Sequence, residues 1–165
     1  MSAIFYYQGN DQFLRELSET MCDAFGDDLI ALVVFGSYAR CEAKLTSDCD
    51  VYLIARALPT NRLDRLEHIH LPVIARFARA ISIIAETKTE FESGFPSLYL
   101  DVATDGIVLF DRDDYIRKKL ARVRELTRLA GLQRVRMNGD FAWKWQRQPA
   151  PRWTLDWEGF HEFVR

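Results

Sequence analysis

The fold of this chain is decided by residues 29–55, which read LIALVVFGSYARCEAKLTSDCDVYLIA. The first seven of these residues form an apolar run that is short and rich in β-branched side chains, which is typical of a strand buried on both faces. Gly36-Ser37 ends that run, and residues 38–43 have the composition of a short helix. Residues 50–55 form a second short apolar run. The stretch therefore predicts a strand, a tight turn, a short helix and a second strand.

Helical and strand patterns continue on both sides of this stretch. Upstream, apolar residues recur at helical spacing over residues 11–25, with Asp11 as the N-cap and Gly26 as the stop. Residues 81–85 and 106–110 have the composition of strands. One further helix is predicted to begin near Arg62, with an adjustment at Pro72. The remaining helices are predicted over residues 87–91, 98–104 and 113–129. The pattern predicts an α/β fold in which helices flank a small mixed sheet, with a basic helix and a tryptophan-rich tail at the C-terminal end.

The composition is that of one globular domain. The chain has 165 residues, of which 48% are hydrophobic and 28% are charged, and this balance argues against disorder. No apolar run approaches the roughly 18–20 residues that cross a bilayer, so we expect no membrane span. Three cysteines leave one unpaired in any disulfide scheme, and the chain does not start with a secretory signal. We therefore expect a cytoplasmic protein with reduced thiols.

Charge is distributed unevenly along the chain. The net charge of −2 excludes binding of nucleic acid through bulk charge alone. Residues 112–136, however, contain nine Lys or Arg residues and only three acidic ones. This basic stretch is either the solvated face of a helix or a groove for an anionic partner such as RNA or a nucleotide.

The C-terminal part of the chain differs from the rest. All four tryptophans lie within residues 143–157, with Pro149 and Pro151 between them. Such aromatic density is unfavourable in water, so we expect this tail to pack against the domain or against a second subunit, with base stacking as the alternative. The sequence thus predicts a domain over residues 1–137 and a tail over residues 138–165, with room for a homo- or hetero-oligomer.

The turn at Gly36-Ser37 has the features of a phosphate-binding turn. Glycine allows the backbone to approach a ligand closely, and the start of the following helix offers free N–H groups with a partial positive charge. The Ser37 hydroxyl is a further donor. Arg40, just after this turn, either contacts phosphate or forms a surface salt bridge. Gly36, Ser37 and Arg40 are therefore the candidate nucleotide-binding residues.

Two carboxylates stand at the start of the second strand. Asp48 and Asp50 are separated by one residue, and the two-residue period of a strand directs both side chains to one face. Two like charges held this close require a cation, and oxygen ligands favour Mg²⁺. A phosphate-binding turn beside a metal-binding carboxylate pair is what phosphoryl or nucleotidyl transfer requires.

In order and spacing, Gly36, Ser37, Asp48 and Asp50 match a Gly-Ser-x10-Asp-x-Asp signature. The chain thereby resembles the nucleotidyltransferase superfamily that includes DNA polymerase beta, and over residues 8–137 it is most similar to minimal, single-domain prokaryotic members. The resemblance implies an enzyme that uses Mg²⁺ to transfer a nucleoside monophosphate from an NTP, with ATP expected, to a hydroxyl of a protein or RNA. Many such members act as antitoxins paired with a HEPN-type toxin subunit, which implies a partner-binding role as the alternative.

The third strand departs from the pattern of that family. Relatives carry an acidic residue there that binds metal and helps to activate the attacking hydroxyl, whereas Ser82 occupies the expected position in this chain. Glu86 lies on the same face, about 13 Å further along at the rise of a strand. If a different register or bend brings Glu86 near, the catalytic set is Asp48, Asp50 and Glu86. Otherwise the chain is a nucleotide-binding or partner-binding module.

Overall fold

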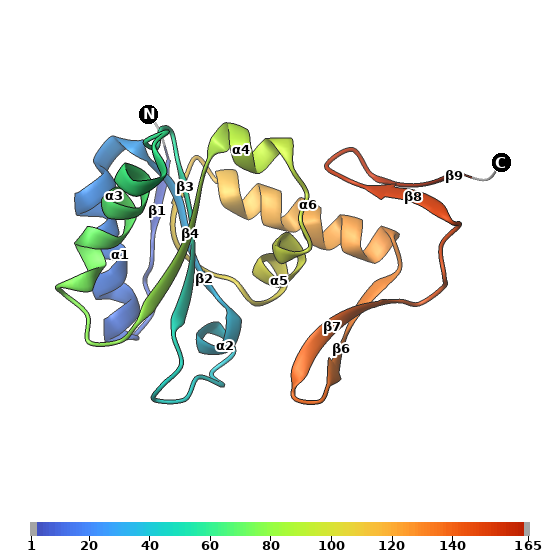
Figure 1. The fold of residues 1–165 in the computed structure, drawn as a ribbon, viewed down its shortest axis with the longest axis horizontal. Helices are drawn as coiled ribbons and strands as arrows, with labels where there is room; N and C mark the ends of the chain where they lie inside the picture. The colour runs from blue at the N-terminus through green and yellow to red at the C-terminus, as the bar shows by residue number, and fades with distance from the viewer. Residues whose placement is uncertain (1–2, 164–165) are drawn as a thin grey trace.

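Five strands form one mixed sheet in the computed structural model, which describes residues 3–163 (Figure 1). The strands are β1 (Ile4–Tyr6), β2 (Leu29–Phe35), β3 (Cys49–Ala55), β4 (Ile81–Thr87) and β5 (Ile107–Arg112). Their order across the sheet is β1-β5-β2-β3-β4, and every neighbouring pair is antiparallel except β3 and β4. The predicted small mixed sheet is confirmed, although β1 was not predicted because three residues carry too short a pattern.

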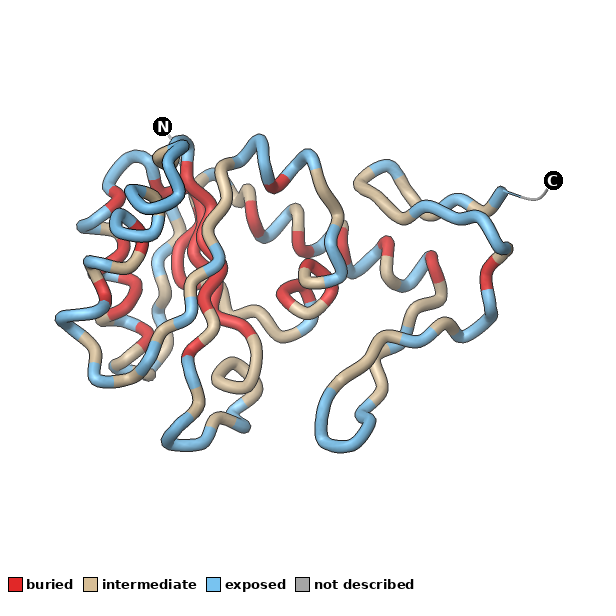
Figure 2. The backbone as a smooth tube through the Cα atoms, in the orientation of Figure 1, coloured by how far each residue is buried: buried red, intermediate tan, exposed pale blue. Residues whose placement is uncertain are grey.

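Helices cover both faces of this sheet. They are α1 (Gln12–Phe25), a 3₁₀ turn (Gly26–Asp28), α2 (Gly36–Ala39), α3 (Arg62–Ile74), α4 (Lys88–Ser93), α5 (Leu98–Asp105) and α6 (Tyr115–Leu129). α1 and α3 pack on one face, where Leu32 and Leu53 of the central strands join their core (Figure 1). α4, α5 and α6 pack on the other face, over Val33 and Tyr52. Figure 2 shows that burial is concentrated along the central strands.

Aspartate side chains cap the helices at the two ends of the domain. Asp11 accepts a hydrogen bond from the Leu14 N–H at 3.2 Å, so it caps α1 as predicted. α6 is capped from β5, because the fully buried Asp111 accepts hydrogen bonds from the N–H groups of Ile116 at 2.9 Å and Arg117 at 3.2 Å. None of the helices described over residues 3–163 is both long and apolar enough to span a bilayer.

Two β-hairpins follow α6. β6 (Leu132–Met137) pairs with β7 (Asp140–Trp145), and β8 (Arg152–Leu155) pairs with β9 (Phe160–Phe163), as Figure 1 shows at the C-terminal end. The boundary predicted at 137/138 falls in the turn of the first hairpin. That turn is Asn138-Gly139, with φ of 52° and 94°. Asn-Gly is the strongest local hairpin signal, and it could have predicted this element.

Two of the tail tryptophans contact the domain. The Trp143 indole N–H donates to Asp101 of α5 at 3.0 Å, and the Trp157 N–H donates to the Gly94 carbonyl at 2.9 Å. The Trp157 ring also packs on Phe91, with 5.2 Å between the ring centroids. Within the described residues, Trp143 and Trp157 therefore pack against the domain of the same chain.

Most basic residues of the stretch 112–136 are engaged within the molecule. The main contacts are Arg112 with Asp27, Arg117 with Asp111, Lys119 with Glu92, Arg122 with Glu125, Arg124 with the Ala103 carbonyl, Arg134 with Asp105 and Arg136 with Glu42. Several of these contacts hold α6 and β6 against the domain. Most charges of the stretch are therefore paired within the molecule and not free to line a basic groove.

Candidate active site

The turn after β2 brings its backbone against a carboxylate of β3. Gly36 begins α2 with a φ of 73°, and a Cβ built there would stand 2.5 Å from Oδ2 of Asp50. The left-handed backbone favours glycine, and a Cβ at this position would have to displace the Asp50 carboxylate or the turn. The contact follows from the antiparallel ladder, in which Phe35 at the end of β2 pairs with Asp50. The predicted turn therefore lies beside Asp50, one of the two predicted carboxylates.

Asp48 and Asp50 lie at the start of β3 and repel each other. Asp50 is the second residue of the strand and is half-buried, whereas Asp48 is exposed just before the strand begins. Burial, reinforced by the charge of Asp48, raises the pKa of Asp50 above its ordinary value, and Arg40 opposes this rise only in part. Two carboxylates that disfavour each other in this way fit a site for a divalent cation.

The residues around the pair suit a cation that arrives with a ligand. Among residues 3–163, no third metal-ligating side chain joins the two aspartates. Mg²⁺ is commonly bound by one or two carboxylates together with substrate phosphates and water. Asp48 and Asp50 would supply the protein oxygens, and the phosphates of a nucleotide held at Gly36 would supply others. The donor set therefore fits Mg²⁺ with a nucleotide better than it fits a structural metal.

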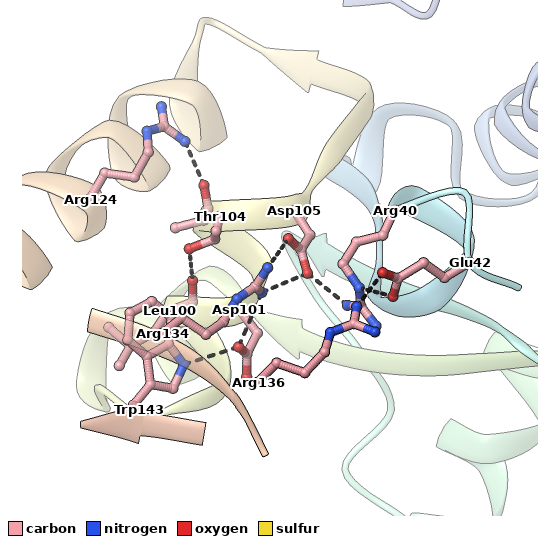
Figure 3. A network of polar contacts seen from close by, with 11 residues as sticks. Arg40, Glu42, Leu100, Asp101, Thr104, Asp105, Arg124, Arg134, Arg136 and Trp143 are labelled. Atoms are coloured by element: carbon pink, nitrogen blue, oxygen red, sulfur yellow. Dashed lines mark hydrogen bonds and ion pairs between the residues drawn. The ribbon is translucent and has the colours of Figure 1, made fainter. Parts of the chain in front are cut away.

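Arg40 is turned toward carboxylates of the protein itself (Figure 3). Its guanidinium donates to Asp105 of α5 at 2.7 Å and to Glu42 at 2.9 Å. Of the two roles considered for Arg40, the structure shows the salt bridge. Sequence reasoning missed Asp105 as its partner, because 65 residues separate the two and no local pattern links them.

Glu86 is not brought to the aspartate pair. In the parallel ladder of β3 and β4, Ser82 pairs with Asp50, and Glu86 lies four positions further along. At the rise of a strand this separation is about 13 Å. Glu86 instead accepts hydrogen bonds from the hydroxyls of Tyr52 and Tyr99, the latter at 2.8 Å. The expectation that a change of register would make Glu86 the third catalytic carboxylate is therefore wrong, because β4 continues in register from Ser82 to Glu86.

Comparison with known proteins gives this geometry a context. Residues 3–83 match the family described as "Putative nucleotidyltransferase DUF294". The "Putative protein adenylyltransferase MJ1305" of Methanocaldococcus jannaschii is 35% identical over 120 residues, which are 70% of this chain and 79% of that protein. A chain from a crystal structure of a mutant toxin–antitoxin complex, MntA–HpeT, aligns with a TM-score of 0.51 and 16% identity, over 68% of this chain and 84% of that chain. This last likeness concerns the fold alone.

The mixed sheet, the glycine turn and the two aspartates together define a nucleotidyltransferase domain. The identity of 35% with the archaeal protein, over most of both chains, shows the family to which the chain belongs. This chain belongs to the minimal nucleotidyltransferases of the superfamily that includes DNA polymerase beta.

Proposed function

We propose that this chain transfers AMP from ATP to a hydroxyl group of a protein acceptor, with Mg²⁺ bound at Asp48 and Asp50. The observation that carries the proposal is the close approach of the Asp50 carboxylate to Gly36, where a Cβ would stand only 2.5 Å from Oδ2, and it supports a phosphate-binding turn beside a cation-binding residue. The name of the archaeal relative, a protein adenylyltransferase, supports ATP and a protein acceptor. The internal pairing of the basic stretch 112–136 favours protein over RNA as the acceptor.

Each group of the site has a defined task in this proposal. The N–H groups and the hydroxyl at Gly36 and Ser37 hold the β- and γ-phosphates. Asp48 and Asp50 hold the cation, which when bound neutralises charge on the triphosphate. The acceptor oxygen attacks the α-phosphorus, the bond from that phosphorus to the bridging oxygen breaks, and pyrophosphate leaves.

β4 offers no carboxylate next to Asp50 to take the proton of the attacking hydroxyl. Ser82 stands opposite Asp50, and Glu86 is held by two tyrosine hydroxyls further along the strand. A positioned general base typically contributes about 10²–10⁴-fold to a rate. We therefore expect slow transfer, with the proton passing to water or to a group on the acceptor.

The fate of labelled ATP tests this function. With Mg²⁺ and an extract of the source cells, the chain is expected to label a protein from ATP that carries ³²P in the α-phosphate. ATP that carries ³²P in the γ-phosphate should leave that protein unlabelled, which separates transfer of AMP from phosphorylation. EDTA should abolish the labelling, because the cation is needed to hold the triphosphate. Labelling from the γ-phosphate alone would contradict the proposal.

Glu86→Gln is expected to leave the rate of AMP transfer unchanged, because Glu86 lies far from the aspartate pair. Glu86→Ala is expected to lower the free energy of unfolding by about 1–3 kcal/mol, because the Tyr52 hydroxyl loses its acceptor and the Tyr99 hydroxyl keeps only the Phe91 carbonyl at 3.2 Å. Tyr52 and Tyr99 are 1% and 2% exposed. Chemical denaturation and the labelling assay measure the two effects. A large loss of transfer by Glu86→Gln, with stability retained, would return Glu86 to the catalytic set.

A second candidate function is a nucleotide-binding partner of the antitoxin type, joined to a HEPN-like toxin. The observation that favours it is Ser82 opposite Asp50, at the position where an acidic residue is expected in an active relative. In that case ATP would raise the thermal midpoint of the chain, but no label would pass from its α-phosphate to any protein. The labelling assay and thermal denaturation with ATP therefore separate the two candidates.

A further inference from the structure

Two main-chain hydrogen bonds fix the shape of the turn at Gly36 and Ser37. The Arg40 N–H donates to the Gly36 carbonyl at 3.2 Å, and the Glu42 N–H donates to the Ser37 carbonyl at 2.9 Å. A carbonyl and the N–H that follows it belong to one planar peptide unit, so these bonds also orient the N–H groups of Ser37 and Tyr38. In the proposed function, the Ser37 N–H is one of the groups that hold the phosphates.

The side chains of Arg40 and Glu42 are linked by ion pairs to the first C-terminal hairpin (Figure 3). Arg40 donates to Asp105 at 2.7 Å, and Arg134 of β6 donates to both oxygens of Asp105, each at 2.7 Å. Glu42 accepts hydrogen bonds from Arg40 at 2.9 Å and from Arg136 of β6. Two routes therefore lead from the turn to β6, one through Asp105 and one through Glu42.

Burial makes the route through Asp105 the stronger one. The side chains of Asp105 and Arg134 are 6% and 14% exposed, whereas those of Glu42 and Arg136 are 40% and 52% exposed. Exposed ion pairs contribute little, while a bidentate contact between arginine and carboxylate fixes geometry as well as charge. Burial raises the pKa of Asp105, but its hydrogen bonds with the two arginines outweigh this and lower the pKa below its ordinary value.

The ring of Phe141 on β7 adds an aromatic contact to these ion pairs. The guanidinium carbons of Arg40, Arg134 and Arg136 lie 4.9, 4.2 and 4.7 Å from its centroid. An aromatic face attracts cations, so the ring helps to gather three like charges at one place. The hairpin is thus joined to the turn by charge and by an aromatic ring, with no strand shared between them.

We propose that the β6–β7 hairpin positions the nucleotide-binding turn, with Arg134 as the main positioning residue and Arg136 as a weaker one. The inference rests on the proposed function, because it assigns the hairpin a part in the binding of ATP. The hairpin lies outside residues 3–83, the segment that matches the family. Loosening it lowers the affinity for ATP without removing any group that touches the nucleotide.

Hydrogen exchange in the nucleotide-free protein tests the positioning directly. Arg134→Ala is expected to speed exchange of the N–H groups of Arg40 and Glu42 about tenfold, which is the scale of one hydrogen bond to a charged group. Arg136→Ala is expected to speed the same exchange by a smaller factor, because its ion pair is exposed. Both N–H groups are followed by mass spectrometry of peptides that cover residues 36–44.

Titration with ATP in the presence of Mg²⁺ tests the consequence for binding. Arg134→Ala is expected to raise the Kd for ATP about tenfold, and Arg134→Lys to raise it less, since lysine keeps the charge without the bidentate contact. Arg147→Ala is the matched control. It removes an ion pair between Arg147 and Glu162, 2.6 Å long, from the same tail but not from the turn. Its exchange at residues 40 and 42 and its Kd should equal those of the unchanged chain.

Equal exchange at residues 40 and 42 in Arg134→Ala and Arg147→Ala would overturn the inference. Faster exchange with an unchanged Kd would overturn it as well, because the shape of the turn would then not matter for binding. If the unchanged chain binds no ATP, the proposed function fails, while the exchange measurement still decides whether the hairpin holds the turn. If Arg134→Ala does not fold, Arg136→Ala supplies the same comparison at an exposed position.

Discussion

Asp50→Asn is expected to reduce AMP transfer at least about 100-fold. Loss of a residue that only supports a metal ligand costs up to about 100-fold, and Asp50 is proposed to be a ligand itself. Asp50→Asn is also expected to raise the thermal midpoint of the nucleotide-free protein. Transfer falls because the amide is a poorer ligand for Mg²⁺ and leaves a single carboxylate at the site. The midpoint rises because burial and the charge of Asp48 disfavour the ionised form of Asp50, which is why its pKa is raised.

The gain in stability should depend on pH. The pKa of Asp50 is higher in the folded protein than in the unfolded chain, so the folded state binds this proton more tightly. Asp50 therefore favours folding at low pH, and this contribution is lost as the pH rises through its folded-state pKa. Asp50→Asn should raise the thermal midpoint at neutral pH, and the difference from the unchanged protein should disappear in acid. Thermal denaturation followed by circular dichroism measures both.

Asp140→Asn is the control, because it removes a carboxylate from an exposed position on the hairpin. It should change neither the transfer rate nor the thermal midpoint at neutral pH. Mg²⁺ with ATP should raise the thermal midpoint of the unchanged protein, because a bound ligand shifts the unfolding equilibrium. In Asp50→Asn most of this rise should be lost, because the ligand binds more weakly. Undiminished transfer by Asp50→Asn would remove the assignment of Asp50 as a ligand of the metal.

Gly36→Ala is expected to lower the free energy of unfolding by about 1–2 kcal/mol, which is the cost of a left-handed backbone at a residue with a Cβ. Its effect on transfer should be larger, at least about tenfold, because a displacement of 1 Å at a reacting site can cost about 100-fold. The new methyl group would start 2.5 Å from Oδ2 of Asp50, so the turn or the carboxylate must move. The labelling assay and chemical denaturation measure the two effects.

Gly131→Ala separates the strain of the backbone from the contact with Asp50. Gly131 has a φ of 69°, close to the 73° of Gly36, but the nearest atom to a Cβ there is Oε1 of Gln146 at 3.9 Å. The two alanine variants should therefore lose similar backbone stability, and only Gly36→Ala should lose transfer. Equal transfer by the two variants would show that the approach of Gly36 to Asp50 does not matter for the reaction.

The centre of the site could be predicted because it is local. β2, the turn and β3 follow one another within residues 29–55, and an antiparallel ladder between neighbouring strands returns Asp50 to Phe35 and Gly36. Apolar runs, a glycine and the spacing of two aspartates are enough to predict that arrangement. The position of Ser82 beside Asp50 could also be predicted, because β3 and β4 pair in a regular parallel register.

The surroundings of the site could not be predicted, because they depend on long-range pairs. Arg40 meets Asp105 across 65 residues, and Glu42 meets Arg136 across 94. Ion pairs of this kind carry no periodic pattern, and the sequence left two roles open for Arg40. Glu86 shows the same limit, because its acceptance of two buried tyrosine hydroxyls depends on how α5 packs over the sheet.

β5 is the last strand of the sheet to be synthesised, yet it lies between β1 and β2. Until residue 112 has left the ribosome, β1 has no partner, and β2, whose seven residues are all buried in the finished protein, keeps one edge open. At about 5–20 residues per second, translation leaves this edge open for several seconds. An open apolar edge invites pairing with other chains. Residues 3–83, which match the family, end before β5, so that segment lacks the strand that pairs with both β1 and β2.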